Sequence, residues 1–208
     1  MNALDEPTQT LSLAGLLPPE VGEAFVGALW KDLAAGRVSF EPHSEKPLRK
    51  NAIETSGQRY PPLQALHWGL TPTVATLLDI EILPSFAYFR IYFGGDICRI
   101  HSDRADCQFS LSVVLSLSDA VPWELNVGTR PAIPLSEAAE DFGDEPFISF
   151  PMSAGDAILY RGAMRRHGRL SPNPNRWSAQ PATHPKRRPP FSTADDRSGT
   201  RNRAPHPR

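Results

Sequence analysis

Two histidines and one aspartate are the residues whose types and spacing point most directly to chemistry. His101 and Asp103 form a His-x-Asp triplet just after a strand-like run, and His167 follows a second strand-like run 64 residues after Asp103. Two imidazoles and one carboxylate can bind one face of an octahedral ferrous ion and leave the opposite face open for reactants. The three residues therefore predict a mononuclear iron site.

Each of these residues also has a plainer interpretation. A histidine taken singly is more often a hydrogen-bonded structural residue than a metal ligand, and His167 belongs to a basic patch, Arg165-Arg166-His167 with Arg169 two residues further on, that is typical of a solvated surface. The context favours the metal site. The triplet lies just past a Gly-Gly-Asp turn at residues 94–96, and His167 comes a strand and a turn after Gly155-Asp156.

Arg176 and Ser178 form a second candidate pair. Arg176 comes nine residues after His167, and Ser178 follows it. An arginine on a neighbouring strand can bind a carboxylate bidentately from the back of a pocket. The alternative, an exposed loop arginine, stays open.

Six short motifs follow one another between residues 84 and 180. They are Phe89-Arg90-Ile91-Tyr92, Gly95-Asp96, His101-Ser102-Asp103-Arg104, Gly155-Asp156, Tyr160-Arg161-Gly162 and His167. In this order they resemble the iron(II)/2-oxoglutarate-dependent dioxygenases, most closely the prolyl-4-hydroxylase-like branch and its small bacterial members. The resemblance implies a double-stranded β-helix, a cupin-like jelly-roll of two packed sheets.

The resemblance also implies a role for individual residues. By this likeness the iron ligands are His101, Asp103 and His167, and the residues that bind the 2-oxoglutarate co-substrate are Arg176, Ser178 and Tyr92. Such enzymes use iron(II), dioxygen and 2-oxoglutarate, and they hydroxylate a substrate with release of succinate and carbon dioxide. The resemblance leaves the substrate open: peptidyl proline, another side chain, a small metabolite and a modified base are all compatible with it.

The hydrophobic periodicity predicts helices first and short strands after them. Helices are expected over residues 18–35 and 61–80, the second broken near Thr71-Pro72 because proline lacks an amide hydrogen. Strands are expected over 86–93, 97–100, 109–118, 123–127, 132–135, 147–150 and 157–161. This order is typical of a mainly β fold, a sandwich or barrel with N-terminal helical support.

The last 28 residues differ in composition from the rest. Residues 1–180 carry a formal charge of −6, whereas residues 181–208 carry +5 and contain six prolines. We therefore expect one oxygenase-like domain over 1–180 and a disordered basic tail over 181–208. Pro181 is expected to cut short the strand that starts at Arg176, and the tail resembles sequence read in a shifted frame. Resequencing of the coding DNA tests that last hypothesis.

Composition narrows the other function classes. No apolar run is long enough to span a membrane, the first ten residues carry two acids and no base, and the two cysteines form no Cys-x-x-Cys pair. We expect a reduced, cytoplasmic protein without a membrane partner.

Two alternatives to an oxygenase remain open. One is a catalytically weak or inactive jelly-roll binding protein with a truncated last strand. The other is a nucleic-acid-associated protein, for which the basic tail is the only support, so we regard nucleic acid as an unlikely partner. The expected partner is an unidentified small molecule or peptide, and the sequence does not predict the oligomeric state.

Overall fold

The computed structural model describes residues 9–43, 48 and 52–188. Its elements in chain order are β1 (Thr10–Leu13), α1 (Pro19–Ala34), β2 (Glu41–His43), β3 (Ala52–Ser56), α2 (Pro61–Leu78), β4 (Ile82–Phe93), β5 (Cys98–His101), β6 (Ser110–Val113), β7 (Ser116–Leu117), β8 (Leu125–Pro131), β9 (Phe147–Phe150), β10 (Ala157–Tyr160), β11 (Arg165–Arg169) and β12 (Trp177–Arg187). This described part of the chain is mainly β, and both of its helices lie toward the N-terminus.

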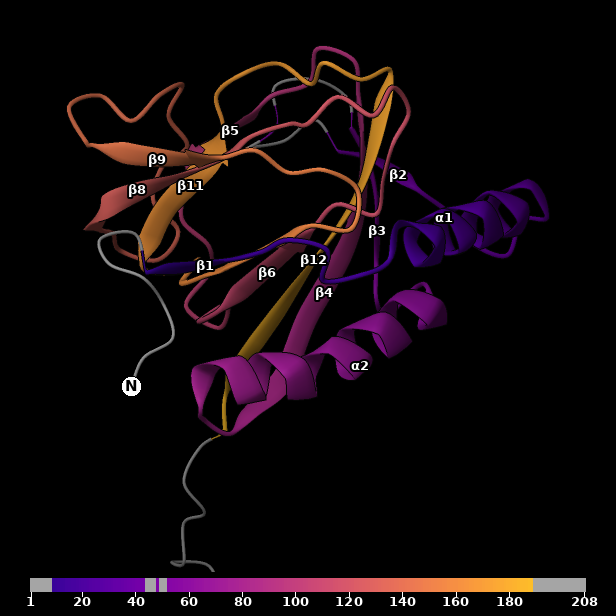
Figure 1. The fold of residues 1–208 in the computed structure, drawn as a ribbon, viewed down its shortest axis with the longest axis horizontal. Coiled ribbons are helices and arrows are strands. Elements are labelled where there is room, and N and C mark those ends of the chain that lie inside the picture. The colour runs from indigo at the N-terminus through magenta and orange to yellow at the C-terminus, as the bar shows by residue number, and fades with distance from the viewer. Residues whose placement is uncertain (1–8, 44–47, 49–51, 189–208) are drawn as a thin grey trace, which may run out of the picture.

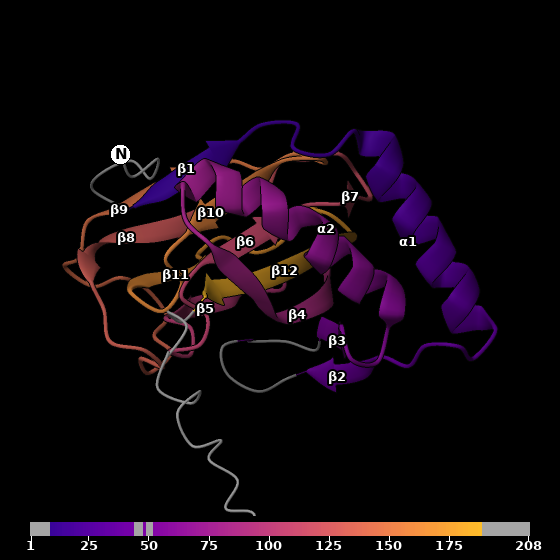
Figure 2. The ribbon, with the colours of Figure 1, turned by 90° about the horizontal axis from the view of Figure 1, so that it is seen from below.

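Two antiparallel sheets form the body of the molecule (Figure 1). The larger sheet has the order β1-β10-β6-β12-β4-β3-β2, with β7 paired to β12, and the smaller has the order β5-β11-β8-β9. Both helices lie on the outer side of the larger sheet, and the smaller sheet faces its other side (Figures 1 and 2). This is the two-sheet arrangement of a double-stranded β-helix, as predicted.

The main hydrophobic core lies between the helices and the larger sheet. Its fully buried side chains include six from α1, α2, β4, β6 and β10: Leu29, Leu63, Phe89, Ile91, Leu111 and Leu159. A second cluster lies between the two sheets and includes Val114, Val127, Met152 and Ile158. The inner space between the sheets is therefore only partly filled by apolar side chains, and polar residues occupy the rest.

The helix α2 runs continuously through Pro72, so the predicted break near Thr71-Pro72 is wrong. Pro72 cannot donate to the carbonyl of Trp68, which costs one intrahelical hydrogen bond. Leu70 and Val74, on either side of the proline, are both buried against the sheet. Tertiary packing of this face holds the two halves of the helix together and outweighs the local loss.

The strand β12 continues to Arg187, so the prediction that Pro181 ends it is wrong. β12 pairs with β4 along its whole length, from Trp177↔Phe93 to Arg187↔Ile82. The boundary that we predicted at residue 180 therefore falls inside a central strand, and residues 181–187 belong to the sheet. The remainder of the predicted tail, from residue 189, lies outside the described residues.

The positions of the prolines explain why β12 is not interrupted. Leu115 donates its amide hydrogen to the carbonyl of Ala179, and Phe109 donates to the carbonyl of Pro185. Odd-numbered residues of β12 therefore direct their backbone groups away from β4. Pro181 falls between the segments that pair with β7 and with β6. Because Pro181 would direct its amide away from β4, the missing hydrogen leaves the hydrogen bonds with β4 intact. A proline at an even-numbered position of β12 would break one of them.

Residues 132–135 form a loop and no strand, in contrast to the prediction. The loop is held by residues of the His-x-Asp triplet: Ser102 donates its hydroxyl to the carbonyl of Ile133, and Leu135 donates its amide to the carbonyl of Asp103. The side chains of Ile133 and Leu135 are exposed to solvent.

The predicted strand 109–118 is divided into two shorter strands, β6 and β7. Among the described residues, none of the helices is long and apolar enough to cross a bilayer.

His67 on α2 is expected to reduce stability in acid. It is almost fully buried, and neither ring nitrogen has a hydrogen-bond partner among the described residues. Burial, with a smaller contribution from His184, lowers its pKa from 6.5 to about 4. The unfolded chain therefore takes up a proton first, and this site destabilises the fold as the pH falls from 6.5 towards 4.

We expect His67→Leu to raise the free energy of unfolding by about 1–2 kcal/mol near neutral pH, because it removes two buried polar atoms without partners. The variant should also lose less stability than the wild type between about pH 7 and pH 4. Urea unfolding of both proteins across this range measures the effect. Equal acid dependence in the two proteins would contradict the assignment to His67.

Candidate metal centre

His101, Asp103 and His167 converge between the two sheets. His101 ends β5, His167 lies in the middle of β11, and the two residues are paired across the sheet. Oδ1 of Asp103 lies 3.8 Å from Nε2 of His101 and 3.6 Å from Nε2 of His167. One ligand atom from each residue lies within 4.8 Å of the other two. Three residues that lie in two distant parts of the sequence thus each direct one donor atom toward the same point.

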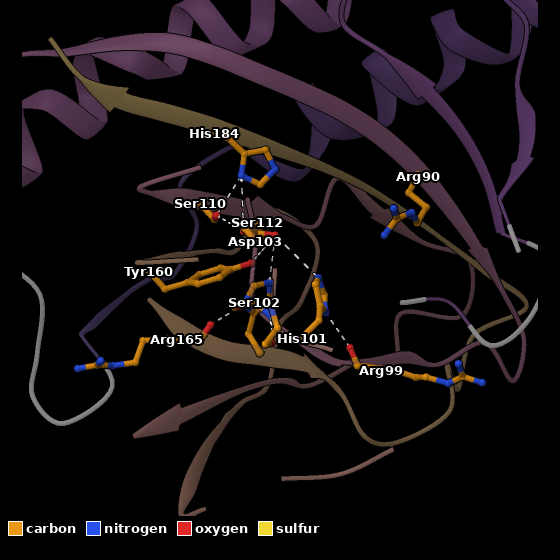
Figure 3. Close-up of polar contacts among 12 residues, drawn as sticks. Arg90, Arg99, His101, Ser102, Asp103, Ser110, Ser112, Tyr160, Arg165 and His184 are labelled. Carbon is orange, nitrogen blue, oxygen red and sulfur yellow. Dashed lines mark hydrogen bonds and ion pairs between the residues drawn. The ribbon is translucent and has the colours of Figure 1, made fainter. Parts of the chain in front are cut away.

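The backbone fixes the tautomer of both imidazoles. Nδ1 of His101 lies 2.8 Å from the carbonyl oxygen of Arg99 (Figure 3), and Nδ1 of His167 lies 3.0 Å from that of Arg165. A carbonyl only accepts, so each Nδ1 carries the hydrogen and donates it. Each neutral ring therefore presents the lone pair of Nε2 to Asp103 and its surroundings. This is the orientation that a metal-binding histidine needs.

The charges in this cluster are strongly coupled. Burial lowers the pKa of His101 to about 4, with help from His167. Burial opposes protonation of His167 as well, but the negative charge of Asp103 outweighs this effect and raises the pKa of His167. Burial favours the neutral acid at Asp103, yet the three histidines around it, His167, His184 and His101, together hold its pKa well below the usual range. Asp103 is therefore an anion, as a ligand must be.

A short hydrogen-bonded chain orients Asp103 from behind. Ser110 donates its hydroxyl to Oδ2 of Asp103 at 2.6 Å, and Nδ1 of His184 lies 2.9 Å from the same hydroxyl oxygen (Figure 3). Since the serine hydrogen is used on the carboxylate, His184 is the donor to Ser110. Oδ1 remains directed toward the two histidines. We predicted a role for neither Ser110 nor His184 from the sequence. His184 was missed because we assigned residue 184 to a disordered tail.

Ser110→Ala is expected to weaken metal binding about 10- to 100-fold, because groups that orient a ligand typically contribute this much. The variant leaves Oδ2 of Asp103 without its hydroxyl donor and His184 without its acceptor. Anaerobic titration with cobalt(II), followed by its visible absorption, measures the change. Ser112→Ala is the matched control, since the Ser112 hydroxyl contacts Tyr160 and not Asp103. Equal affinity in the two variants would contradict the role of Ser110.

The predicted co-substrate residues lie in three different environments. Tyr92 is buried and lines a cavity next to the histidines. Ser178 is fully buried, and it accepts hydrogen bonds from Asn173 and Gln180. Arg176, in contrast, has a side chain that is 80% exposed and ion-paired with Asp119. The structure therefore does not bring Arg176 to the cluster, and the exposed-loop alternative describes its position.

A different arginine reaches the space that we expected Arg176 to occupy. Arg169 is buried and lines a cavity of about 30 Å³ together with Tyr92, His101 and His167. Its guanidinium donates to the carbonyl of Trp123 at 2.8 Å and to Oε1 of Gln180 at 2.6 Å. His167 and Arg169 are two residues apart on one strand and share a face. This signal was present in the sequence, but we assigned Arg169 to a surface patch.

No carboxylate pairs with Arg169 anywhere in the part of the chain that the structure describes. Its partners are two amide oxygens, the sulfur of Met152 and the indole face of Trp123, all of them neutral. Burial lowers its pKa. A buried charge without a counter-ion is costly, and an anion in the cavity would offset that cost.

A second, more open pocket reaches the metal-binding cluster from the other side. It has a volume of about 360 Å³ and is lined by Glu54, Phe86, Tyr88, Arg90, His101, Ser102, Asp103, Arg104, Cys107, Leu135 and His184. Arg90 is ion-paired with Glu54, and Arg104 stacks on the ring of Phe86. The three donor atoms therefore lie between a small inner cavity and a larger outer pocket.

Comparison with known proteins identifies the fold. The sequence matches no family model, and no curated protein matches it. Among solved structures, HygX from Streptomyces hygroscopicus, with nickel, 2-oxoglutarate and hygromycin B bound, matches with a TM-score of 0.64 and 15% identity over 89% of this chain and 85% of that chain. A prolyl-4-hydroxylase of Pseudomonas putida matches with a TM-score of 0.59 and 16% identity over 86% and 93%.

The chain has the fold of the iron(II)/2-oxoglutarate oxygenases. A third structure with this fold, the 2-oxoglutarate-dependent carbocyclase SnoK from nogalamycin biosynthesis, matches with a TM-score of 0.63 and 12% identity over 91% of this chain and 89% of that chain. The oxygenase fold and the His-x-Asp and His cluster confirm the predicted architecture. At this level of identity, the likeness establishes the fold only. The donor set of two neutral imidazoles and one carboxylate fits iron(II).

Proposed function

We propose that this protein is an iron(II)- and 2-oxoglutarate-dependent oxygenase. One observation carries the proposal. Both Nε2 lone pairs and a carboxylate oxygen meet within an oxygenase fold, and both Nδ1 hydrogens are used on backbone carbonyls. His101, Asp103 and His167 would hold the iron. When bound, the iron would supply the activation of dioxygen that no protein side chain can provide.

The inner cavity is the proposed site for 2-oxoglutarate. We assign Arg169, in place of Arg176, to bind the distal carboxylate, because Arg169 is the buried cation without an acidic partner beside His101 and His167. The oxygen of Gln180 now accepts from the guanidinium and takes the position of a carboxylate oxygen. A cavity of about 30 Å³ is too small for a five-carbon dicarboxylate. The side chain of Gln180 must therefore move aside when the co-substrate binds.

Tyr92 and Ser178 have supporting roles in this proposal. Tyr92 accepts a hydrogen bond from Arg90 at 3.0 Å, and burial raises the pKa of its hydroxyl to about 12, so it stays protonated and can donate to an anion. Ser178 receives a hydrogen bond from Nε2 of Gln180. Ser178 would therefore position the side-chain amide of Gln180, and it would not contact the co-substrate itself.

The outer pocket is the proposed place of the substrate. It opens beside His101 and Asp103 and has room for part of a small molecule or a peptide side chain. We propose hydroxylation as the reaction. Solved structures with this fold include proteins described as a hydroxylase, a carbocyclase and an epimerase. The fold therefore hosts several outcomes, and product analysis must decide between them.

The test has a spectroscopic and a catalytic part. Anaerobic protein with iron(II) and 2-oxoglutarate is expected to show the visible absorption of an iron-chelated 2-oxo acid, and exposure to air is expected to yield succinate. Arg169→Met should weaken 2-oxoglutarate binding at least about tenfold, because a charge-assisted hydrogen bond is lost. Arg176→Met should change it by less than about fivefold, as expected for an exposed ion pair. Absence of both absorption and succinate would refute the proposal.

An inactive binding protein with the same fold is the second candidate. The contact between Gln180 and Arg169 favours it, because the amide fills the place that a carboxylate would need. Gln180→Ala separates the two candidates. In an oxygenase, the variant should still bind 2-oxoglutarate and form succinate, since only the amide is lost. If wild type and variant bind metal but neither binds 2-oxoglutarate, the binding-protein candidate is correct.

A further inference from the structure

A third pocket lies near the metal-binding cluster but contains none of its residues. It has a volume of about 360 Å³ and is lined by Ala105, Gln108, Phe109, Pro134, Arg161, Ala163, Met164 and Arg187. Residues of the segment 104–108 border both this pocket and the outer pocket described above. Arg104 and Cys107 line the outer pocket, whereas Ala105 and Gln108 line this one. We refer to it as the arginine pocket, after Arg161 and Arg187.

The charge of the arginine pocket is not compensated. Its lining contains two arginines and no acidic residue. Among the described residues, neither the half-buried Arg161 nor the exposed Arg187 makes an ion pair, whereas Lys186 and Arg188, on either side of Arg187, pair with Asp106 and Glu81, respectively. The protein therefore provides carboxylates for the adjacent basic residues and leaves these two guanidinium groups free to bind an anion.

The guanidinium of Arg161 lies near an aromatic ring and has no acidic partner among the described residues. Its Cζ lies 5.7 Å from the centre of the Phe109 ring, and its Nε is buried without a hydrogen-bond partner among the described residues. On the other wall, the backbone amide of Arg187 donates to Oε1 of Gln108 at 3.0 Å. A buried donor without a partner costs free energy, which adds to the cost of the uncompensated charge of Arg161.

The remaining wall of the arginine pocket is apolar. Phe109, Pro134, Ala163 and Met164 contribute it, and Met164 is 42% exposed. A pocket of this size, with an apolar wall and two arginines in its lining, suits a small organic anion better than an inorganic one. An inorganic ion would leave the apolar wall in contact with water.

We propose that the arginine pocket binds a small organic carboxylate with an apolar body, such as an aromatic acid. The carboxylate accepts hydrogen bonds from Arg161 and Arg187, and the apolar body packs on Phe109, Pro134 and Met164. The ligand sits outside the metal-binding cluster, so this proposal does not depend on the oxygenase activity.

The experiment uses the full chain without metal, in the presence of a chelator, with phenylacetate as the probe. Isothermal titration calorimetry is expected to show saturable binding of phenylacetate, and much weaker binding of phenylacetamide and inorganic phosphate. Arg161→Met and Arg187→Met should each weaken phenylacetate binding at least about tenfold. Arg37→Met is the control, because Arg37 is ion-paired with Asp32 on α1 and should leave binding unchanged.

The Arg169→Met variant distinguishes the arginine pocket from the inner cavity. Phenylacetate binding should be the same in this variant as in the wild type. Loss of binding in Arg169→Met, with normal binding in Arg161→Met, would place the probe in the inner cavity and overturn the proposal. It would also fail if phenylacetamide bound as well as phenylacetate, or if no saturable binding were observed.

Discussion

Asp103→Ala is expected to lower the affinity for iron(II) at least about 100-fold and to abolish succinate formation. Ligand-orienting groups alone typically contribute 10- to 100-fold, and the loss of a ligand itself should exceed this range. Asp103 supplies the negative charge of the cluster, since both histidines bind as neutral rings. Without it, two imidazoles remain, with no anion to offset the charge of the metal.

The measurement is anaerobic titration with iron(II) or cobalt(II), followed by a succinate assay. Asp144→Asn is the matched control, because Asp144 is exposed and, within the described part of the chain, its carboxylate pairs with Arg130 and not with the metal-binding cluster. Thermal unfolding of the metal-free proteins shows whether Asp103→Ala still folds. If the folded Asp103→Ala variant bound iron(II) as tightly as Asp144→Asn, the three residues would not be the metal site.

The three proposed ligands could be anticipated from local turns and apolar runs, although His167 lies within β11, a strand that we did not predict. His101 and His167 each follow an apolar run, and antiparallel pairing across a sheet then places them side by side. The helix α1 was predictable for the same reason, since its apolar periodicity and its initial proline are properties of a short segment. In these cases the sequence pattern and the tertiary structure agree.

The predictions for Pro181 and Arg176 were wrong because contacts between residues far apart in the sequence determine the structure at both positions. Whether β12 continues through Pro181 depends on whether the backbone of Pro181 faces β4 or the gap between β6 and β7. Only the register of β12 determines this orientation. Arg169 and Arg176 are both plausible anchors in the sequence. The loop from β11 to β12 then places Arg176 beside Asp119 on the surface. Neither result follows from composition or periodicity.

Gly162→Ala is expected to damage both stability and metal binding. A Cβ at position 162 would overlap Oδ2 of Asp103 and the hydroxyl of Ser110. Neither atom can move away freely: the amide of Asp103 donates to the carbonyl of Gly162, and Ser110 holds both Asp103 and His184. Overpacking at a rigid position typically costs about 1–3 kcal/mol. We expect the upper end of this range.

Metal affinity should fall about 10- to 100-fold in Gly162→Ala, because the methyl group displaces the carboxylate that Ser110 orients. Gly69→Ala is the control: a Cβ there meets nothing within 4 Å, so the change should be neutral or should stabilise α2 by up to about 1 kcal/mol. Urea unfolding and cobalt(II) titration of both variants measure the two effects. If Gly162→Ala lost stability but kept its metal affinity, Asp103 would tolerate displacement, and the rear support by Ser110 would not position the ligand.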